Sequence, residues 1–474
     1  LNASARVFIS HLLPPKLGTQ STLVETLAHR LREAAQESAN PHRGTMLTAR
    51  IAASLEKSDA PIEISENNLA ALVRLCGASE FFGEMLASNP ALIGSLGIEK
   101  ARLRRREFRA QLRASIDAGK SFSADLSALR REWSKLLIEI GAHDAGQDIS
   151  ILASNQLQTE LAIASINVSY LVARREMVRR YGRLNSDPRI AILALGRLAS
   201  GGVDYGSDLD IILVYDSLVW SPVRSLTQDE AYARLGELMI VALSSVTREG
   251  YLYRVDLRLR PDGKNGPLVT SSERLLDYFR QRSSIWEWLA YVKLRAVAGD
   301  LELGMMIETH ARHVIHEKAR EIDSGELSQE TQRVRERLER EKGRSGRQSG
   351  IDIKFSAGGM LDVYFATRYL QLRDDVADEG DDRSTSSTLD RLEETGSLDN
   401  QDYEALSNGY GLLRSVDHYL RLVMGKVAAL PAMEHPALRE IARKLDFKTA
   451  ADLNKTLIER MQAIRQAYER IMAE

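Results

Sequence analysis

The sequence predicts an α+β fold in which a small mixed-sheet core lies between two largely helical regions. Short apolar runs bounded by turn residues occur in the middle of the chain, at residues 189–195 and 208–215, whereas helical spacing of apolar residues dominates before and after them. A chain of 474 residues is too long for one hydrophobic core. We expect a helical N-terminal region over 1–115, a central catalytic domain over 116–302 and a C-terminal helical bundle over 303–474.

Composition and charge exclude several classes of protein. Lys and Arg number 64 against 66 Asp and Glu, and this near-balance argues against a nucleic-acid binder. The single cysteine, Cys76, cannot form an internal disulfide and fits a reducing compartment. No apolar run approaches the roughly 20 residues of a membrane span, and no signal-peptide pattern opens the chain. We expect a cytoplasmic protein without a membrane partner and, because Leu1 is not Met, a fragment of a longer polypeptide.

Helical periodicity is clear on both sides of the core. Residues 68–76 and 160–175 show it in the first half, and residues 458–472 form a last helix. One face of another long helix is expected to carry five apolar residues: Leu406, Tyr410, Leu413, Leu420 and Met424. The run at 374–383, D-D-V-A-D-E-G-D-D-R, predicts a polar, flexible insertion.

Three strands are expected in the core. The first covers 189–195, a glycine-bearing connection follows at 196–205, and the second strand covers 208–215. Thr227 and Glu230 form a capping box, T-Q-D-E, that opens a helix running through 239–243. Alternating apolar and polar residues predict a third strand over 251–260, which ends at the turn P-D-G at 261–263.

Two aspartates stand two residues apart in G-S-D-L-D-I-I-L-V-Y, at 206–215. On a strand, Asp208 and Asp210 project from the same face, where their like charges repel. A divalent cation relieves that repulsion, and carboxylate-rich sites suit Mg²⁺ or Mn²⁺. By the same alternation, Asp256, Arg258 and Arg260 share one face of the third strand, where arginines could grip phosphate oxygens.

The residues before the paired aspartates favour phosphate binding. Gly206 allows close approach of the backbone, and the Ser207 hydroxyl can donate to phosphoryl oxygens. The chemistry predicted is attack at the α-phosphorus of a nucleoside triphosphate, with metal ions that activate the nucleophile and stabilise the departing pyrophosphate. No P-loop motif occurs, which argues against γ-phosphoryl transfer of that class. A D-x-D pair alone is common at strand starts. The prediction of a metal site therefore depends on the pair together with Gly206, Ser207, the glycine-bearing connection before them and Asp256 on the third strand.

Other residues allow two interpretations. Residues 286–295 predict a core helix, although Lys293 and Arg295 could reach a phosphate or a base. The paired glycines in K-F-S-A-G-G-M-L-D-V, at 354–363, form either a tight turn or a loop that closes over substrate. His418, on a helix and without partners at ligand spacing, is expected to be structural.

Four segments carry a family resemblance. They are A-L-G-R-L-A-S-G-G-V-D-Y-G-S-D-L-D-I-I-L-V-Y-D at 194–216, Y-R-V-D-L-R-L-R-P-D-G-K-N-G-P-L-V-T-S at 253–271, W-E-W-L-A-Y-V-K-L-R-A-V-A-G-D at 286–300 and D-I-K-F-S-A-G-G-M-L-D-V-Y-F at 352–365. In this order they resemble the glutamine synthetase adenylyltransferase/adenylyl-removing family, a branch of the polymerase-β-like nucleotidyltransferases. The resemblance implies a polymerase-β-like core over 116–302 and ATP as substrate.

The family's members resemble two catalytic units in tandem, one that transfers AMP to a tyrosine of glutamine synthetase and one that removes it by phosphorolysis. S-D-L-D-I-I-L-V-Y-D and the L-D-V after the paired glycines look more like the C-terminal, transferring unit. Adenylyl transfer in nitrogen regulation is therefore expected, with the removing activity or a regulatory nucleotide-sensing module as alternatives. Glutamine synthetase would be the protein substrate, and a PII-type nitrogen signal protein is a further expected partner.

Carried over to this sequence, the resemblance implies that Asp208, Asp210 and Asp256 are catalytic and bind Mg²⁺ or Mn²⁺. It implies phosphate contacts at Gly206 and Ser207, and we assign Arg258 and Arg260 to phosphate or partner contacts. The sequence departs from the family at Tyr364, where D-V-E-F is usual, and at Asp204, where Glu is commoner.

Overall fold

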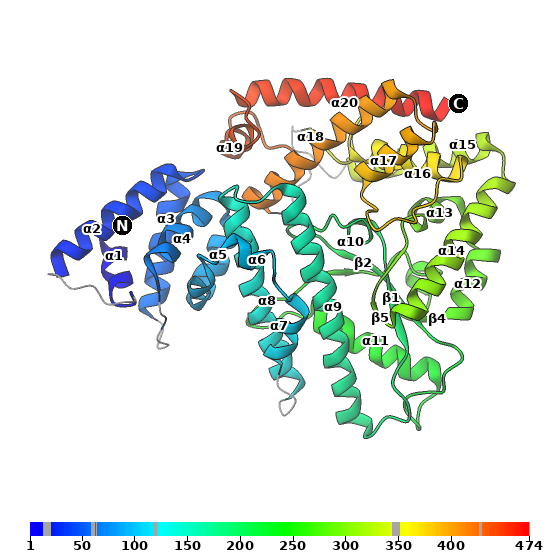
Figure 1. Cartoon of the computed structure of the whole chain (residues 1–474), viewed down its shortest axis with the longest axis horizontal. Helices are drawn as coiled ribbons and strands as arrows, with labels where there is room; N and C mark the ends of the chain where they lie inside the picture. Colours follow the sequence, from blue (N-terminus) through cyan, green and yellow to red (C-terminus); the bar gives the residue numbers. More distant parts are fainter. Residues whose placement is uncertain are drawn as a thin grey trace.

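A five-stranded mixed sheet forms the centre of the molecule, and helices from both halves of the chain surround it (Figure 1). The computed structural model describes residues 1–12, 20–57, 62, 64–116, 121–343, 351–425 and 429–473. The predicted α+β class is confirmed. In this part of the chain, no helix is both long and apolar enough to cross a membrane.

The sheet is built on two long, buried strands. The strands are β1 (Ile190–Ala194), β2 (Leu209–Tyr215), β3 (Val255–Asp256), β4 (Val269–Ser271) and β5 (Arg295–Gly299). The first two pair antiparallel, β5 adds antiparallel to the free edge of β1, and β3 and β4 both add parallel to β2. Every residue of β1 and β2 is fully buried except Asp210. The sheet therefore directs one carboxylate out of an otherwise apolar strand.

The described part of the chain before β1 is helical. Its elements are α1 (Asn2–Ile9), α2 (Gln20–Glu37), α3 (Pro41–Glu56), α4 (Glu66–Ala78), α5 (Glu80–Ser88), the 3₁₀ helix η1 (Pro90–Ser95), α6 (Lys100–Leu103), α7 (Phe108–Ser115), α8 (Phe122–Ala145) and α9 (Ile151–Tyr181). Ser121 and Ser150 cap α8 and α9 by accepting backbone N–H bonds. These two helices bring the N-terminal region to the sheet.

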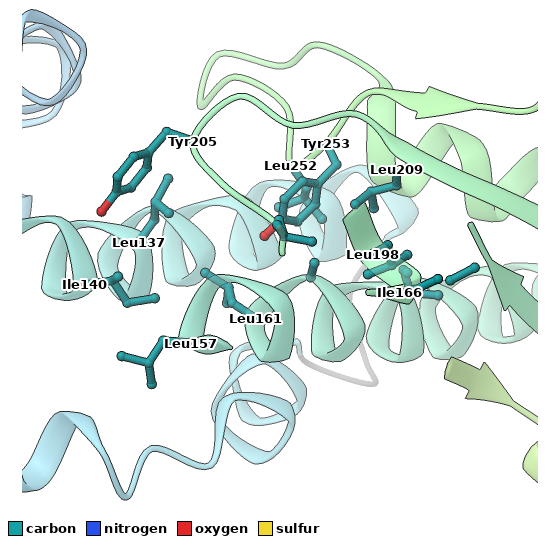
Figure 2. Close-up of a cluster of buried hydrophobic side chains, with 14 of the residues drawn as sticks. Leu137, Ile140, Leu157, Leu161, Ile166, Leu198, Tyr205, Leu209, Leu252 and Tyr253 are labelled. Atoms are coloured by element: carbon teal, nitrogen blue, oxygen red, sulfur yellow. The ribbon is translucent and has the colours of Figure 1, made fainter. Parts of the chain in front are cut away.

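Side chains of α8 and α9 pack directly under the loop that leads into β2 (Figure 2). Leu137 of α8 lies beside Tyr205, Leu161 of α9 and Leu209 belong to the same cluster, and all four are buried. Burying a side chain of this size contributes about 1.5–3 kcal/mol to folding. This apolar layer fixes the position of the segment that carries the paired aspartates.

Five helices and a short 3₁₀ turn complete the central part of the chain. They are α10 (Gly196–Ala199), α11 (Gln228–Ser244), η2 (Gly263–Asn265), α12 (Ser272–Gln281), α13 (Ile285–Tyr291) and α14 (Leu301–Glu321). The capping box of Thr227 and Glu230 is confirmed at the start of α11. The expected core helix at 286–295 is confirmed in its first part, as α13.

The C-terminal helices are α15 (Ser324–Gly343), α16 (Met360–Arg373), α17 (Thr385–Glu394), α18 (Asn400–Met424), α19 (Pro436–Lys444) and α20 (Ala450–Ala473). The apolar face predicted for α18 is confirmed and packs against α20, which crosses the top of Figure 1. Arg43 of α3 forms an ion pair with Glu440 of α19 at 2.8 Å, so the two helical regions also touch each other.

The expected third strand over 251–260 is wrong in length, because only Val255 and Asp256 form a strand. Oδ1 of Asp256 accepts the backbone N–H of Arg258 at 2.9 Å, which replaces a ladder bond. Arg260 N then donates to the carbonyl of Leu257 at 3.2 Å, so the chain turns. Arg258 and Arg260 consequently do not continue a strand face from Asp256.

The acidic run 374–383 is also anchored, contrary to the expected flexible insertion. The side chain of Asp378 is fully buried and forms an ion pair with Lys293 at 2.6 Å. Arg391 of α17 pairs with the same carboxylate. Arg383 is held by Glu308 of α14 at 2.7 Å. Buried opposite charges therefore fix the segment between α16 and α17.

Candidate functional site

A cavity of about 280 Å³ lies where the sheet meets the C-terminal helices. It is lined by Gly196, Arg197, Ser200, Ser207, Asp208, Asp210, Asp256, Arg258, Lys293, Lys354, Leu361, Tyr364, Arg368, Thr385 and Arg421. Larger hollows of about 730 and 740 Å³ lie beside α6 and α17, but no strand residue lines either of them. The smaller cavity is the one that contains the paired aspartates.

The three predicted carboxylates meet at this cavity. Asp210 of β2 pairs in register with Asp256 of β3, and Asp208 lies two residues earlier on the same chain. Burial, followed by the charge of Asp256, raises the pKa of Asp210 to about 6, and Asp208 adds to the effect. The carboxylates are therefore close enough for their charges to repel strongly.

The loop before β2 is tightly wound. Gly206 adopts a φ of +66°, which glycine tolerates without strain. Ser207 N donates to the carbonyl of Asp204 at 2.9 Å, and Ser207 Oγ accepts from Asp204 N at 3.1 Å. Ser207 lines the cavity and Gly206 does not, so Gly206 contributes through the turn.

Gly196, at the start of α10, lies against the carboxylate of Asp210. Its φ is +56°, and a Cβ atom there would come within 2.7 Å of Oδ2 of Asp210. The absence of a side chain therefore leaves room for this carboxylate beside the backbone of α10.

The two predicted arginines have different positions. Arg258 lines the cavity, and its Nε lies 2.9 Å from Oδ2 of Asp256. Arg260 is not among the lining residues; its guanidinium donates to backbone carbonyls of Leu257 at 2.9 Å and Gly266 at 3.3 Å. In this structure Arg260 stabilises the turn that follows β3.

The donor set suits a hard divalent cation, because three carboxylates face one polar cavity. Within the described ranges, however, no three acidic, histidine or cysteine side chains stand in an arrangement that could hold a metal ion. Asp256 explains part of this, since its carboxylate is engaged by Arg258. The residues fit a Mg²⁺ ion by chemistry, and Asp256 would have to turn from Arg258 to join it.

Several lining residues were not singled out in the sequence: Arg197 comes from α10, Arg368 from α16 and Arg421 from α18. Tyr364 of α16, noted in the sequence only as a departure from the family, also lines the cavity. Lys354 and Leu361, on either side of the paired glycines, line it as well. Gly358 has a φ of +72° and Gly359 N donates to the carbonyl of Ser356 at 2.9 Å, so the tight turn is present. Closure of this loop over a substrate stays a prediction.

The side chain of Tyr364 is surrounded by cations. Burial opposes ionisation of its hydroxyl, but Arg197 and Arg414 outweigh that effect and lower the pKa of Tyr364. The guanidinium of Arg368 lies 5.6 Å from the centre of the Tyr364 ring. This wall of the cavity is therefore strongly positive.

Buried polar contacts fasten the C-terminal helices to the loop before β2. His418 of α18 is fully buried between Asp204, before β2, and Asp144 of α8. Nη2 of Arg197 lies 2.5 Å from Oδ2 of Asp417, and Arg421 donates to the carbonyl of Tyr205 at 2.9 Å. The structural interpretation of His418 is confirmed.

Two family models match the chain in succession. Residues 69–310 match the glutamate-ammonia ligase adenylyltransferase model, and residues 332–472 match a PII-uridylyltransferase model. The first match contains β1–β5 and the paired aspartates, whereas the second contains Lys354, Tyr364 and Arg368. The cavity is thus formed between the two matched segments.

Curated relatives carry one shared name, bifunctional glutamine synthetase adenylyltransferase/adenylyl-removing enzyme. The protein of Bradyrhizobium diazoefficiens is 28% identical over 447 residues, which cover 91% of this chain and 44% of the relative. The protein of Rhodopseudomonas palustris strain BisB5 is 29% identical over 419 residues, which cover 86% and 42%. This chain therefore spans less than half the length of these relatives.

The first family model covers just over half of the 474 residues, including the whole sheet. The chain belongs to the glutamate-ammonia ligase adenylyltransferase family.

Proposed function

We propose that this chain transfers AMP from ATP to a tyrosine hydroxyl of glutamine synthetase and releases pyrophosphate. The observation that supports this most directly is the register of Asp210 with Asp256, which brings two acidic side chains together beside Asp208 in one cavity. Family membership and the names of the relatives give the substrate class. The core over 116–302 would be polymerase-β-like, between a helical region at 1–115 and a bundle at 303–474.

Asp208, Asp210 and Asp256 would hold Mg²⁺ or Mn²⁺. When bound there, the cation would make the acceptor hydroxyl easier to deprotonate and would offset the charge that develops on the departing pyrophosphate. The Ser207 hydroxyl lines the cavity and would donate to a phosphate oxygen, with Gly206 providing the turn that positions it. The guanidinium of Arg258 would leave Asp256 and donate to phosphate oxygens. Arg260 would support the turn that follows β3.

The reaction replaces a phosphoanhydride bond of ATP with a phosphodiester bond to the tyrosine. The tyrosine oxygen would bond to the α-phosphorus of ATP as the bond from that phosphorus to the bridging β-phosphate oxygen breaks. The phenolic proton leaves to solvent or to a carboxylate, and pyrophosphate takes the electron pair of the broken bond.

The removing activity is the second candidate, because the relatives' printed name includes both directions. In that case a phosphate oxygen would attack the phosphorus of the tyrosine-bound AMP at the same site. The bond from that phosphorus to the tyrosine oxygen would break, which gives ADP and, after protonation, the free tyrosine hydroxyl. The match of residues 332–472 to a PII-uridylyltransferase model makes a PII-type signal protein a reasonable further partner. A purely regulatory nucleotide-sensing role is the remaining alternative.

Intact-mass analysis tests the proposal. Unmodified glutamine synthetase, incubated with this chain, ATP and Mg²⁺, should gain one AMP per subunit. Asp208→Asn should abolish the gain, whereas Asp277→Asn, which changes an exposed carboxylate of α12, should not. Loss of AMP from adenylylated synthetase in the presence of phosphate would favour the removing activity. No change in either assay would contradict both enzymatic assignments.

A further inference from the structure

We propose that Lys354 and Arg368 form an anion subsite that binds the β- and γ-phosphates of the nucleotide and then the released pyrophosphate. The inference deepens the proposed function and rests on it for the identity of the nucleotide. It assigns a substrate-binding role to the segment beyond residue 350, which supplies both side chains.

Among the described residues, six cationic side chains line the cavity, and four of them form ion pairs with carboxylates. Arg197 and Arg421 share the carboxylate of Asp417. Arg258 is paired with Asp256, and Lys293 is paired with Asp378 at 2.6 Å. These four cations are committed to carboxylates of the protein itself.

Lys354 and Arg368 differ from the other four. Among the described residues, neither has a carboxylate within ion-pair distance, and both are half-buried. The ammonium group of Lys354 lies 5.2 Å from the ring centre of Phe355, and Arg368 lies over Tyr364. Aromatic faces stabilise a cation only modestly, by about 0.5–2 kcal/mol. Each charge thus remains available to an anion that enters the cavity.

Both cations line the same cavity as Asp210. In the described part of the chain neither forms an ion pair with this carboxylate, so each lies farther from it than an ion-pair distance. A phosphate group together with a carboxylate-bound cation would occupy that interval.

The chemistry favours the distal phosphates over the α-phosphate. The α-phosphorus must stay beside the aspartates, where the bond is exchanged. The β- and γ-phosphates carry most of the nucleotide's negative charge and need donors away from the carboxylates. Arg368 supplies a planar guanidinium suited to two phosphate oxygens, and Lys354 supplies a point charge.

The loop that carries Lys354 is held rigidly. Oδ1 of Asp352 accepts the backbone N–H groups of Lys354 and Phe355, each at 2.8 Å. The carbonyl of Lys354 accepts from Leu361 N at 3.1 Å, at the start of α16. Such a preformed loop loses little entropy when an anion binds.

Calorimetric titration of the full chain with ATP, AMP and inorganic pyrophosphate, each with Mg²⁺, tests the subsite. Arg368→Gln and Lys354→Met should each weaken ATP and pyrophosphate binding by about 10- to 100-fold, the loss expected for one charged hydrogen bond. AMP lacks the distal phosphates, so its affinity should change much less. Arg368→Lys should restore part of the loss. Arg373→Gln, on the same helix but paired with Asp374, is the control.

Thermal unfolding of each variant separates a lost contact from a lost fold. Equal weakening of ATP and AMP by a folded Arg368→Gln variant would overturn the subsite, as would unchanged pyrophosphate affinity. If pyrophosphate binding depends on both cations but no AMP reaches glutamine synthetase, the subsite stands and the proposed function fails. If the unaltered chain binds neither ATP nor pyrophosphate, the subsite is refuted as well.

Discussion

The imidazole of His418, on α18, lies between two buried carboxylates, with Nδ1 3.1 Å from Oδ1 of Asp204. Its Nε2 lies 3.1 Å from Oδ1 of Asp144, which also accepts hydrogen bonds from Ser154 and Tyr205 at its other oxygen. Three segments distant in sequence meet at this ring: the end of α8, the loop before β2, and the C-terminal bundle. His418 thus ties the loop before β2 to α8 and to the C-terminal helices.

We expect His418 to make the free energy of unfolding decrease as the pH becomes alkaline. Burial opposes its charge, but Asp144 and Asp204 outweigh burial and raise the pKa of His418 from its ordinary value of 6.5 to about 10. Between these two values the folded state keeps a proton that the unfolded state has lost. The stabilisation is complete below pH 6.5 and disappears as pH rises toward 10, with a slope of up to about 1.4 kcal/mol per pH unit.

Urea unfolding from pH 6 to 10 measures this slope. His418→Gln should be less stable near pH 6.5 by about 3–5 kcal/mol, because two carboxylates stay buried without their cation. It should also lack the alkaline loss of stability. His313→Gln, which changes an exposed histidine of α14, should keep the original slope. An identical slope in the His418 variant would contradict the assignment.

Gly196 and Gly201 offer a matched pair of substitutions in the loop. Both have positive φ, +56° and +72°, so alanine should cost each about 1–2 kcal/mol of backbone strain. A Cβ at Gly196 would lie 2.7 Å from Oδ2 of Asp210, whereas one at Gly201 would meet nothing within 4 Å. We expect similar losses of thermal stability, but only Gly196→Ala should lower the rate of AMP transfer, by about tenfold or more. Equal activity in the two variants would show that AMP transfer tolerates the contact between the added Cβ and the carboxylate of Asp210.

The sequence predicted β2 and its exceptional aspartate well, because a strand buried on both faces leaves a short continuous apolar run bounded by turn residues. It could not predict that Asp256 would be the residue paired with Asp210, since strand pairing is decided by the whole sheet. The alternation at 257–260 was misleading. Asp256 binds the backbone N–H of Arg258, and this local contact ends the strand while the pattern of residues continues.

Long-range charge pairing was also invisible in the sequence. Local composition made 374–383 resemble a flexible insertion, yet Asp378 is fully buried because Lys293 and Arg391 reach it from two other segments. Lys354 and Arg368 were missed for a related reason. Both side chains line the cavity, and neither has an ion-pair partner among the described residues. Neither property can be inferred from the residues next to them in the sequence.

The pair formed by Asp256 and Arg258 predicts competition with the metal ion. Asp256 must release the guanidinium before it can act as a ligand, so Arg258→Ala should lower the Mg²⁺ concentration needed for half-maximal transfer, even if a lost phosphate contact also lowers the maximal rate. Asp256→Asn should do the opposite and reduce transfer by about 100-fold or more, since it removes a ligand charge. Mg²⁺ titrations of both variants test this. A higher Mg²⁺ requirement in Arg258→Ala would show that the arginine helps the site to assemble.

The ion pair of Lys293 and Asp378 predicts an effect on folding. Although Lys293 lines the cavity, its Nζ lies 2.6 Å from Oδ2 of Asp378, and both side chains are almost completely buried. Burial lowers the pKa of Lys293 to about 8 even though Asp378 opposes the shift, so the amine stays charged at neutral pH only with its partner nearby. Lys293→Met should therefore destabilise the chain. Of the two cations that pair with the buried Asp378, Arg391 would be the one left.

A double-mutant cycle distinguishes this role from phosphate binding. The variant with both Lys293→Met and Asp378→Asn should lose less unfolding free energy than the two single variants lose together, with a coupling of about 0.5–3 kcal/mol. The KM for ATP should change little in any variant that remains folded, because Lys293 is committed to Asp378. Additive losses of stability together with a large increase in KM would instead assign Lys293 to the nucleotide. Lys293 would then join Lys354 and Arg368 as a cation that the substrate, and not the protein, neutralises.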